Sequence, residues 1–409
     1  MGHADSTTLQ LDEWEESLLA GAQGPAAAKA MELLVALAKI YGARKMVPVR
    51  SVQVAGVSYH NLGAAGLEYL EETARDGRVG VDLATLNPAG MDLEAWRRMG
   101  IDEEFAGKQL RVVEAYRKMG ISMTLTCTPY LAGNLPMFGE SVAWAESSAV
   151  TFANSVLGAR TNREGGPAAL AAALVGRVPL WGLHLEAERR PNLHVVVKAS
   201  LREPVDWGIL GAHIGRRQGS VLPLITLETD ASPDMASLKA LSAALPTYGA
   251  RPMFHIRDVT PEASAQDVPD ARMDVTDKDL EETGAAVQDA VEDVEMVCLG
   301  CPHATVGELR RLASMLAGRR VKVPVWISVS RPVYDAARSV GLVSLLEEAG
   351  AVVARDTCFV VAPLKGKVRS IATDSAKGCY YSRGHNDMAV RLGTTEQCVE
   401  AALTGRFSG

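Results

Sequence analysis

The chain has 409 residues, a net charge of −7 and a pI near 5.7. This length predicts two or three subdomains, and the acidic balance argues against a nucleic-acid or anionic-membrane partner. Six cysteines are too few for a disulfide scaffold, and no apolar run reaches membrane-spanning length. The polar start does not resemble a secretory signal, so we expect a cytoplasmic protein.

Helical and strand patterns alternate along the chain. Helices are expected at 11–22, which Thr8 or Asp12 can cap, and at 26–43. The following strands are expected at 44–56, 78–87, 121–128, 321–330 and 351–363, and the helices at 66–77, 105–120, 307–319 and 332–350. This alternation predicts α/β layers with mostly parallel sheets. An acidic, polar stretch near 258–289 is expected to connect two subdomains.

Three cysteines lie where predicted strands end or bend. Cys127 and Cys301 each end a predicted strand with a proline within two residues, and Cys358 lies near a bend. Ligands of open α/β sheets bind at strand ends. Cys298 lies three residues before Cys301, so both side chains could serve one site only if the strand has ended by Cys301.

The pair Cys298–Cys301 allows several interpretations. A zinc ribbon needs a second such pair or a pair of histidines at short spacing, which the sequence lacks. A redox dithiol normally opens a helix, whereas Pro302 follows this pair. Free cysteines are also often inert packing residues. Separated cysteines that converge on one crevice suit an iron–sulfur cluster.

A dense polar block covers residues 139–174. Gly165 and Gly166 form a turn, and Pro167 suits the start of a helix whose N-terminus favours anions. Arg160 and Arg163 precede that helix and can bind carboxylate or phosphate with two parallel hydrogen bonds. The block could therefore form an acid-binding floor, or it could be a buried polar network that holds two subdomains together.

A second, basic cluster lies around Ser375 and Lys377. A solvated face is the ordinary interpretation of such a charge run, but this loop of small residues could also close on an anion.

Several motifs together resemble the large, catalytic subunit of the aconitase X family. They are CTPYLAGNLPMFGE, AESSAVTFANSVLGARTNREGGPAALAAAL, LGCPHATVGEL and DTCFVVAP. The resemblance implies one catalytic domain over 1–409 with an aconitase-like fold, in which multi-layer α/β subdomains surround a cluster-containing cleft. It also implies an iron–sulfur cluster of open nuclearity, held by Cys127, Cys301 and Cys358, whose open iron acts as a Lewis acid.

The same resemblance implies a hydro-lyase that removes water from a small hydroxy acid. The expected reaction converts 5-phosphomevalonate to trans-anhydromevalonate 5-phosphate, and dehydration of cis-3-hydroxy-L-proline is the alternative. The swivel domain of the family is absent, so we expect a separate small subunit that supplies the catalytic serine. A cluster-bearing iron or redox sensor without turnover would need a nucleic-acid surface, against which the net charge of −7 argues. A cluster-free scaffold with structural cysteines is a third possibility.

Roles follow for individual residues. His303, Ser148 and Lys377 are the expected catalytic groups, although His303 could equally be a satisfied core histidine. An amine-bearing substrate would need an acid such as Glu146 or Asp356. The residues expected to bind substrate are Glu146, Ser147, Ser148, Asn154, Ser155, Arg160, Thr161, Asn162, Arg163, Ser375, Lys377, Asn134, Asn87 and His60.

Overall fold

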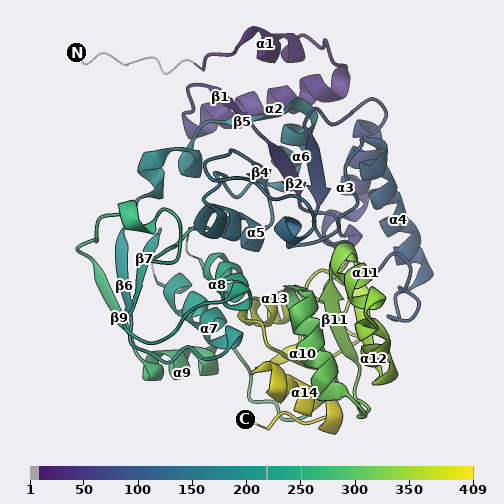
Figure 1. Ribbon diagram of the computed structural model, residues 1–409. Helices are drawn as coiled ribbons and strands as arrows, with labels where there is room; N and C mark the ends of the chain where they lie inside the picture. Colours follow the sequence, from purple (N-terminus) through teal and green to yellow (C-terminus); the bar gives the residue numbers. More distant parts are fainter. Residues whose placement is uncertain (1–8, 218–219, 250, 409) are drawn as a thin grey trace.

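The computed structural model describes residues 9–217, 220–249 and 251–408. Three α/β units follow one another along the chain, with the first at the top, the second at lower left and the third at lower right in Figure 1. Each unit has its own parallel sheet, which confirms the predicted fold class.

The first unit contains a parallel sheet in the order β3-β2-β4 and a separate antiparallel pair, β1-β5. The predicted strand 44–56 is therefore two strands in different sheets. Asp12 caps the first helix as predicted, since its carboxylate accepts the N–H of Glu15 at 2.8 Å, and Thr8 lies outside the described residues. The elements are α1 (Glu13–Leu19), α2 (Pro25–Tyr41), β1 (Met46–Pro48), β2 (Ser51–Val54), α3 (Tyr59–Thr73), β3 (Leu83–Leu86), α4 (Glu103–Lys118), β4 (Ala143–Trp144), α5 (Ser147–Phe152), α6 (Gly166–Val175) and β5 (Arg177–Pro179).

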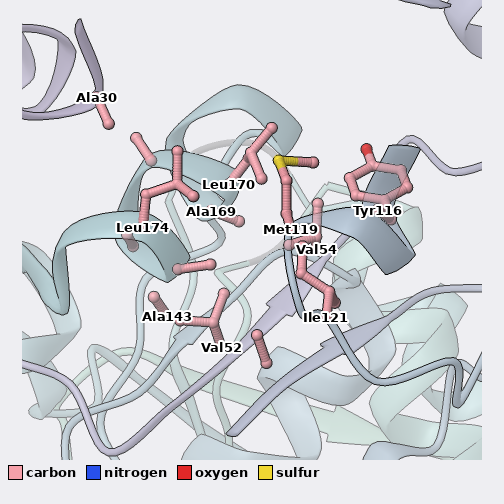
Figure 2. Close-up of a cluster of buried hydrophobic side chains, with 14 of the residues drawn as sticks. Ala30, Val52, Val54, Tyr116, Met119, Ile121, Ala143, Ala169, Leu170 and Leu174 are labelled. Atoms are coloured by element: carbon pink, nitrogen blue, oxygen red, sulfur yellow. The ribbon is translucent and has the colours of Figure 1, made fainter. Parts of the chain in front are cut away.

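The core of this unit lies between the sheet and α6. Figure 2 shows Val52 and Val54 of β2 below Leu170 and Leu174 of α6. Every residue of α6 from Ala168 onward is buried, because the helix packs against α2 on one side and β2 on the other. A helix that is apolar all round belongs in such a central position.

The second unit is a four-stranded parallel sheet in the order β8-β7-β6-β9. The predicted connection 258–289 instead supplies β9 and α9 to this unit. The prediction was wrong because the polar composition masked the alternating pattern of an edge strand. In β9, buried Met273 and Val275 alternate with exposed Arg272 and Asp274. The elements are β6 (Leu193–Val197), α7 (Pro204–Gly215), β7 (Pro223–Leu227), α8 (Met235–Thr247), β8 (His255–Ile256), β9 (Arg272–Val275) and α9 (Asp277–Ala286).

The third unit is a five-stranded parallel sheet in the order β12-β11-β10-β13-β14. The predicted helix 332–350 is two helices, because Gly341 adopts a left-handed φ of 79° between them. The elements are β10 (Met296–Ala304), α10 (Val306–Leu316), β11 (Val325–Val329), α11 (Arg331–Ser339), α12 (Leu342–Glu348), β12 (Ala351–Arg355), β13 (Ser370–Thr373), α13 (Ala376–Asn386), β14 (Ala389–Leu392) and α14 (Thr395–Thr404).

Two predicted strands that carry cysteines differ from expectation: 121–128 forms no strand, and 351–363 forms a short one. Segment 121–128 follows β3 through hydrogen bonds from Ser122 and Thr126, but Leu125 has a φ of 45°, which breaks the extended backbone. The strand expected at 351–363 ends at Arg355, and Asp356 has a φ of 69°. Cys127 and Cys358 therefore lie in irregular segments.

A buried ion pair joins the first unit to the second. Arg189 is fully buried and donates to both carboxylate oxygens of Glu262. Its other N–H groups donate to the carbonyl oxygens of Asn154, Ala159 and Leu183. One guanidinium thus ties residues 154–159 and Leu183 of the first unit to Glu262 of the second.

We expect Glu262→Gln to destabilise the fold, because it leaves a buried guanidinium without a counter-charge. The loss should be about 3–5 kcal/mol of unfolding free energy, the range for broken buried pairs. Glu282→Gln is the matched control, since Glu282 pairs with Lys278 on the exposed face of α9 and should change stability little. Urea unfolding of both variants tests this, and equal effects would contradict the assignment.

Candidate functional site

One cavity between the first and third units gathers much of the predicted site. The predicted residues that line it are Asn87, Cys127, Glu146, Ser147, Arg163, Cys301, Cys358 and Lys377. The rest of the lining also comes from these two units, and none comes from the second.

A bulge in β10 brings Cys301 to the cavity. The ladder between β10 and β11 shifts register between Leu299 and Ala304. Gly300 has a φ of 82°, and a Cβ there would lie 2.3 Å from the carbonyl oxygen of Ser328. Only glycine fits this backbone. The regular ladder therefore ends before Cys301, and Cys298 stays buried in the strand outside the cavity.

The three lining cysteines influence one another electrostatically. Burial, followed by the charges of Cys301 and Cys127, raises the pKa of the Cys358 thiol well above its usual value. Burial raises the pKa of Cys127 to about 12, and the charge of Lys377 opposes this shift. A metal that binds thiolates would relieve this repulsion by displacing the thiol protons.

Within the described ranges, no group of three His, Cys, Asp or Glu side chains could hold a metal ion. The thiolates of an iron–sulfur cluster bind different irons, so they need to surround a shared space rather than converge on one point. Three free cysteines around one cavity fit that requirement.

Glu146 and Lys377 form a buried ion pair across the cavity. Nζ of Lys377 donates to Oε1 of Glu146 and lies 3.5 Å from Oγ of Ser147. Burial alone would raise the pKa of Glu146, but the charge and hydrogen bond of Lys377 lower it to about 2. Burial would lower the pKa of Lys377, and the Glu146 carboxylate raises it instead. Both groups stay ionised at neutral pH.

Two polar groups of the cavity keep unused bonding capacity. Asn87 donates its amide to Glu146 at 2.9 Å, and its buried Oδ1 has no hydrogen-bond partner in the described part of the chain. Arg163 is exposed and has no ion-pair or hydrogen-bond partner among the described residues. Of the two, Arg163 is open to a ligand without breaking an existing contact, whereas Oδ1 of Asn87 is enclosed by protein.

His303 does not line the cavity. It is fully buried, with Nδ1 2.9 Å from Oγ1 of Thr126 and Nε2 3.0 Å from the carbonyl oxygen of Thr357. Burial lowers its pKa to about 3. Both ring nitrogens of the neutral imidazole are therefore committed, and the ring has no free position for a substrate hydroxyl.

Much of the predicted acid-binding floor is a structural network. Asn154 donates to the carbonyl oxygens of Thr161 and Pro252 and accepts from Arg189. The other members also bond within the protein. Ser155 accepts the N–H of Phe254, Thr161 accepts that of Trp144, and Asn162 bonds both Trp181 and Leu183. None of them lines the cavity, because these polar atoms satisfy the backbone of the loops that join the units.

The remaining predicted residues also lie outside the lining. Arg160 pairs with Glu186 and the carbonyl oxygen of His184, and Asn134 bonds buried Thr85 and Val52. Ser148 donates to Glu146 at 3.1 Å, and Ser375 caps α13 by accepting the N–H of Gly378. His60 is largely exposed. Partial desolvation of its ring, followed by the charges of His385 and Lys365, lowers its pKa.

Two lining residues with aromatic rings were missed, and so was Asn61. Tyr381 and His385 lie on α13, which Figure 1 shows beside α8 near the centre of the molecule. They follow Lys377 at successive intervals of four, so all three share one helix face. Their rings lie edge to face, 5.4 Å apart. That spacing is visible in the sequence once the helix is recognised.

None of the described helices is long and apolar enough to cross a membrane.

Comparison with known proteins gives consistent matches along the chain. Three family models match: Aconitase X first domain at 8–187, second domain at 191–285 and third domain at 294–404. The phosphomevalonate dehydratase large subunit of Methanothermobacter thermautotrophicus is 46% identical over 92% of this chain and 94% of its own length. The cis-3-hydroxy-L-proline dehydratase of Hypocrea jecorina is 36% identical over 98% of this chain and 70% of its own.

A solved structure agrees with these matches. The holo-form of Thermococcus kodakaraensis aconitase X superposes with a TM-score of 0.89 at 42% identity, covering 96% of this chain and all of that one. The predicted family, the aconitase-like fold and the hydro-lyase class are confirmed, since the named relatives are dehydratases.

The Glu146–Lys377 pair predicts a distinct pH dependence of stability. Because the pKa of Glu146 is lower in the folded state than in the unfolded chain, its contribution is present at neutral pH. That contribution is lost as the pH falls below the ordinary carboxyl value towards about 2. In urea titrations we expect the stability of the wild type, relative to Glu146→Gln/Lys377→Met, to stay level from pH 7 to the ordinary carboxyl value of 4.5 and then to decline as the pH falls to 3. A difference that does not change with pH would contradict this coupling.

Proposed function

The chain belongs to the aconitase X family, and we propose that it is the large, catalytic subunit of a phosphomevalonate dehydratase. In this proposal it removes water from 5-phosphomevalonate to give trans-anhydromevalonate 5-phosphate. Relatives named phosphomevalonate dehydratase large subunit support it, since they are 38% to 46% identical over 92% to 97% of this chain.

The charges of the lining residues are the main argument for a phosphorylated substrate. Glu146 is the one carboxylate among its described lining residues, and Lys377 already neutralises it. Arg163 is a cation of the lining without a counter-charge. The cavity therefore favours an anionic ligand, and a guanidinium binds phosphate or carboxylate through two parallel hydrogen bonds.

Dehydration of cis-3-hydroxy-L-proline is the second candidate, supported by similarity to enzymes of that name. Its amine would need a free acid. Glu146 is committed to Lys377, while Asp356 is fully buried, pairs with Arg331 at 2.6 Å and does not line the cavity. These pairings make the second candidate the weaker one.

Cys127, Cys301 and Cys358 would hold the iron–sulfur cluster that family membership suggests. An open iron of such a cluster supplies a Lewis acid for the hydroxyl that leaves as water. The charge of Lys377 lowers the pKa of all three thiols against the effect of burial and so favours their thiolate forms.

The proton-accepting group comes from elsewhere in this proposal. Glu146 is a poor base at a pKa of about 2, and Lys377 holds its proton through neutral pH. We propose that a separate small subunit supplies the base, in keeping with relatives that are named large subunits. We further propose that the complex works in the cytoplasm without a nucleic-acid or membrane partner. A sensor without turnover is less consistent with the net charge of −7.

Iron analysis tests the cluster. We expect the chain, purified without oxygen together with the small subunit, to contain iron and acid-labile sulfide. Cys127→Ala, Cys301→Ala and Cys358→Ala should each lose both. Cys298→Ala should keep them, because Cys298 is buried within β10 away from the cavity. Zinc, or no metal, in the wild type would overturn the cluster.

Substrate assays test the reaction and the role of Arg163. Arg163→Met should lower kcat/KM for 5-phosphomevalonate by about 10- to 100-fold, the loss expected for one charge-assisted contact. Arg160→Met is the matched control, since Arg160 is tied to Glu186 outside the cavity. Turnover of cis-3-hydroxy-L-proline but not of 5-phosphomevalonate would select the second candidate.

A further inference from the structure

His303 lies where the three cysteine segments meet. These segments are 126–128, 300–303 and 356–358, and each carries one lining cysteine. The backbone N–H of His303 donates to Sγ of Cys127 at 3.3 Å. His303 itself is two residues from Cys301, so the main chain already links two of the cysteines.

The imidazole ring extends this link to the third segment. Nε2 donates to the carbonyl oxygen of Thr357, the residue before Cys358. The other nitrogen, Nδ1, must then accept from Oγ1 of Thr126. Thr126 in turn accepts the N–H of Thr128 at 3.1 Å and so closes a turn around Cys127.

Regular sheet pairing does not fix these three segments relative to one another. Segment 126–128 is outside any strand, 356–358 lies beyond the end of β12, and 300–303 is the bulge of β10. The described hydrogen bonds that join one segment to another all involve His303. Because the two nitrogens of the rigid imidazole ring are a fixed distance apart, His303 fixes the position of Thr126 relative to Thr357.

We propose that His303 is a positioning residue that holds the three thiolates at the separations a cluster requires. This inference rests on the proposed cluster site. Groups one layer behind the ligands commonly orient them and tune the metal, and N–H contacts to sulfur shift cluster potentials. His303 never touches substrate in this role, which differs from the catalytic contact expected from the sequence.

The test compares three variants of the oxygen-free complex. His303→Leu removes both ring contacts, whereas His303→Gln can keep the donor to Thr357. His255→Leu is the matched control, because His255 is also fully buried and bonds a backbone carbonyl, that of Arg189, in the second unit. Iron and sulfide per chain, the cluster reduction potential and hydrogen exchange of the three segments are measured for each.

We expect His303→Leu to weaken iron retention against a chelator by about 10- to 100-fold, the range for such supporting residues. It should also shift the reduction potential and speed hydrogen exchange in 126–128 and 356–358 together. His303→Gln should recover part of each effect, and His255→Leu should lower stability with an unchanged cluster.

The outcomes separate this inference from the proposed function. Suppose the wild type contains a cluster, and His303→Leu and His255→Leu show the same iron retention, reduction potential and hydrogen exchange. That result overturns the positioning role alone. Absence of iron and sulfide from the wild type overturns the proposed function and, with it, the positioning of thiolates for a cluster.

Discussion

The buried ion pair between Glu146 and Lys377 is the constraint on which the site depends. Glu146 precedes α5 in the first unit, and Lys377 begins α13 in the third, so the pair spans the cavity between units. Two charges this deeply buried are tolerable only together. Their attraction therefore links the two units across the cavity, and Lys377 places its positive charge near three cysteines whose thiolates would repel one another.

Parallel sheet topology explains why the third unit contributes so many groups. Cys358 follows β12, Cys301 lies in the bulge of β10, and Lys377 follows β13. These strands run parallel in one sheet, in the order β12-β11-β10-β13, so their carboxyl ends open at one edge. The first unit supplies the opposite wall through Cys127 and Arg163. The cavity is therefore formed jointly by segments of the first and third units.

The sequence predicted those features correctly for which a local pattern is typical of a single kind of structure. Alternating patterns predicted parallel α/β layers. The strand expected to end at Cys301 instead continues to Ala304, and its regular ladder is interrupted after Leu299. Polar residues such as Asn154 and Thr161 were ambiguous, because the same side chains can bind a ligand or satisfy loop backbone. The local sequence does not distinguish a ligand-binding residue from a structural one. The role of Asn154 depends on its contacts with Arg189 and Pro252, which lie much later in the chain. The left-handed φ of 45° at Leu125 is likewise a break that no strand pattern reports.

The charges of the cavity also bear on why a second chain would be needed. Glu146 and Lys377 cancel, which leaves Arg163 as the uncompensated cation of the described lining. The N-terminus of α13 adds a partial positive charge beside Lys377, and one of its first N–H groups, that of Gly378, already serves the Ser375 cap. A phosphorylated hydroxy acid carries more negative charge than one guanidinium neutralises. A partner that closes over this cavity would therefore bring cationic or hydrogen-bond donor groups as well as a base, and binding and proton removal would then depend on the same closure.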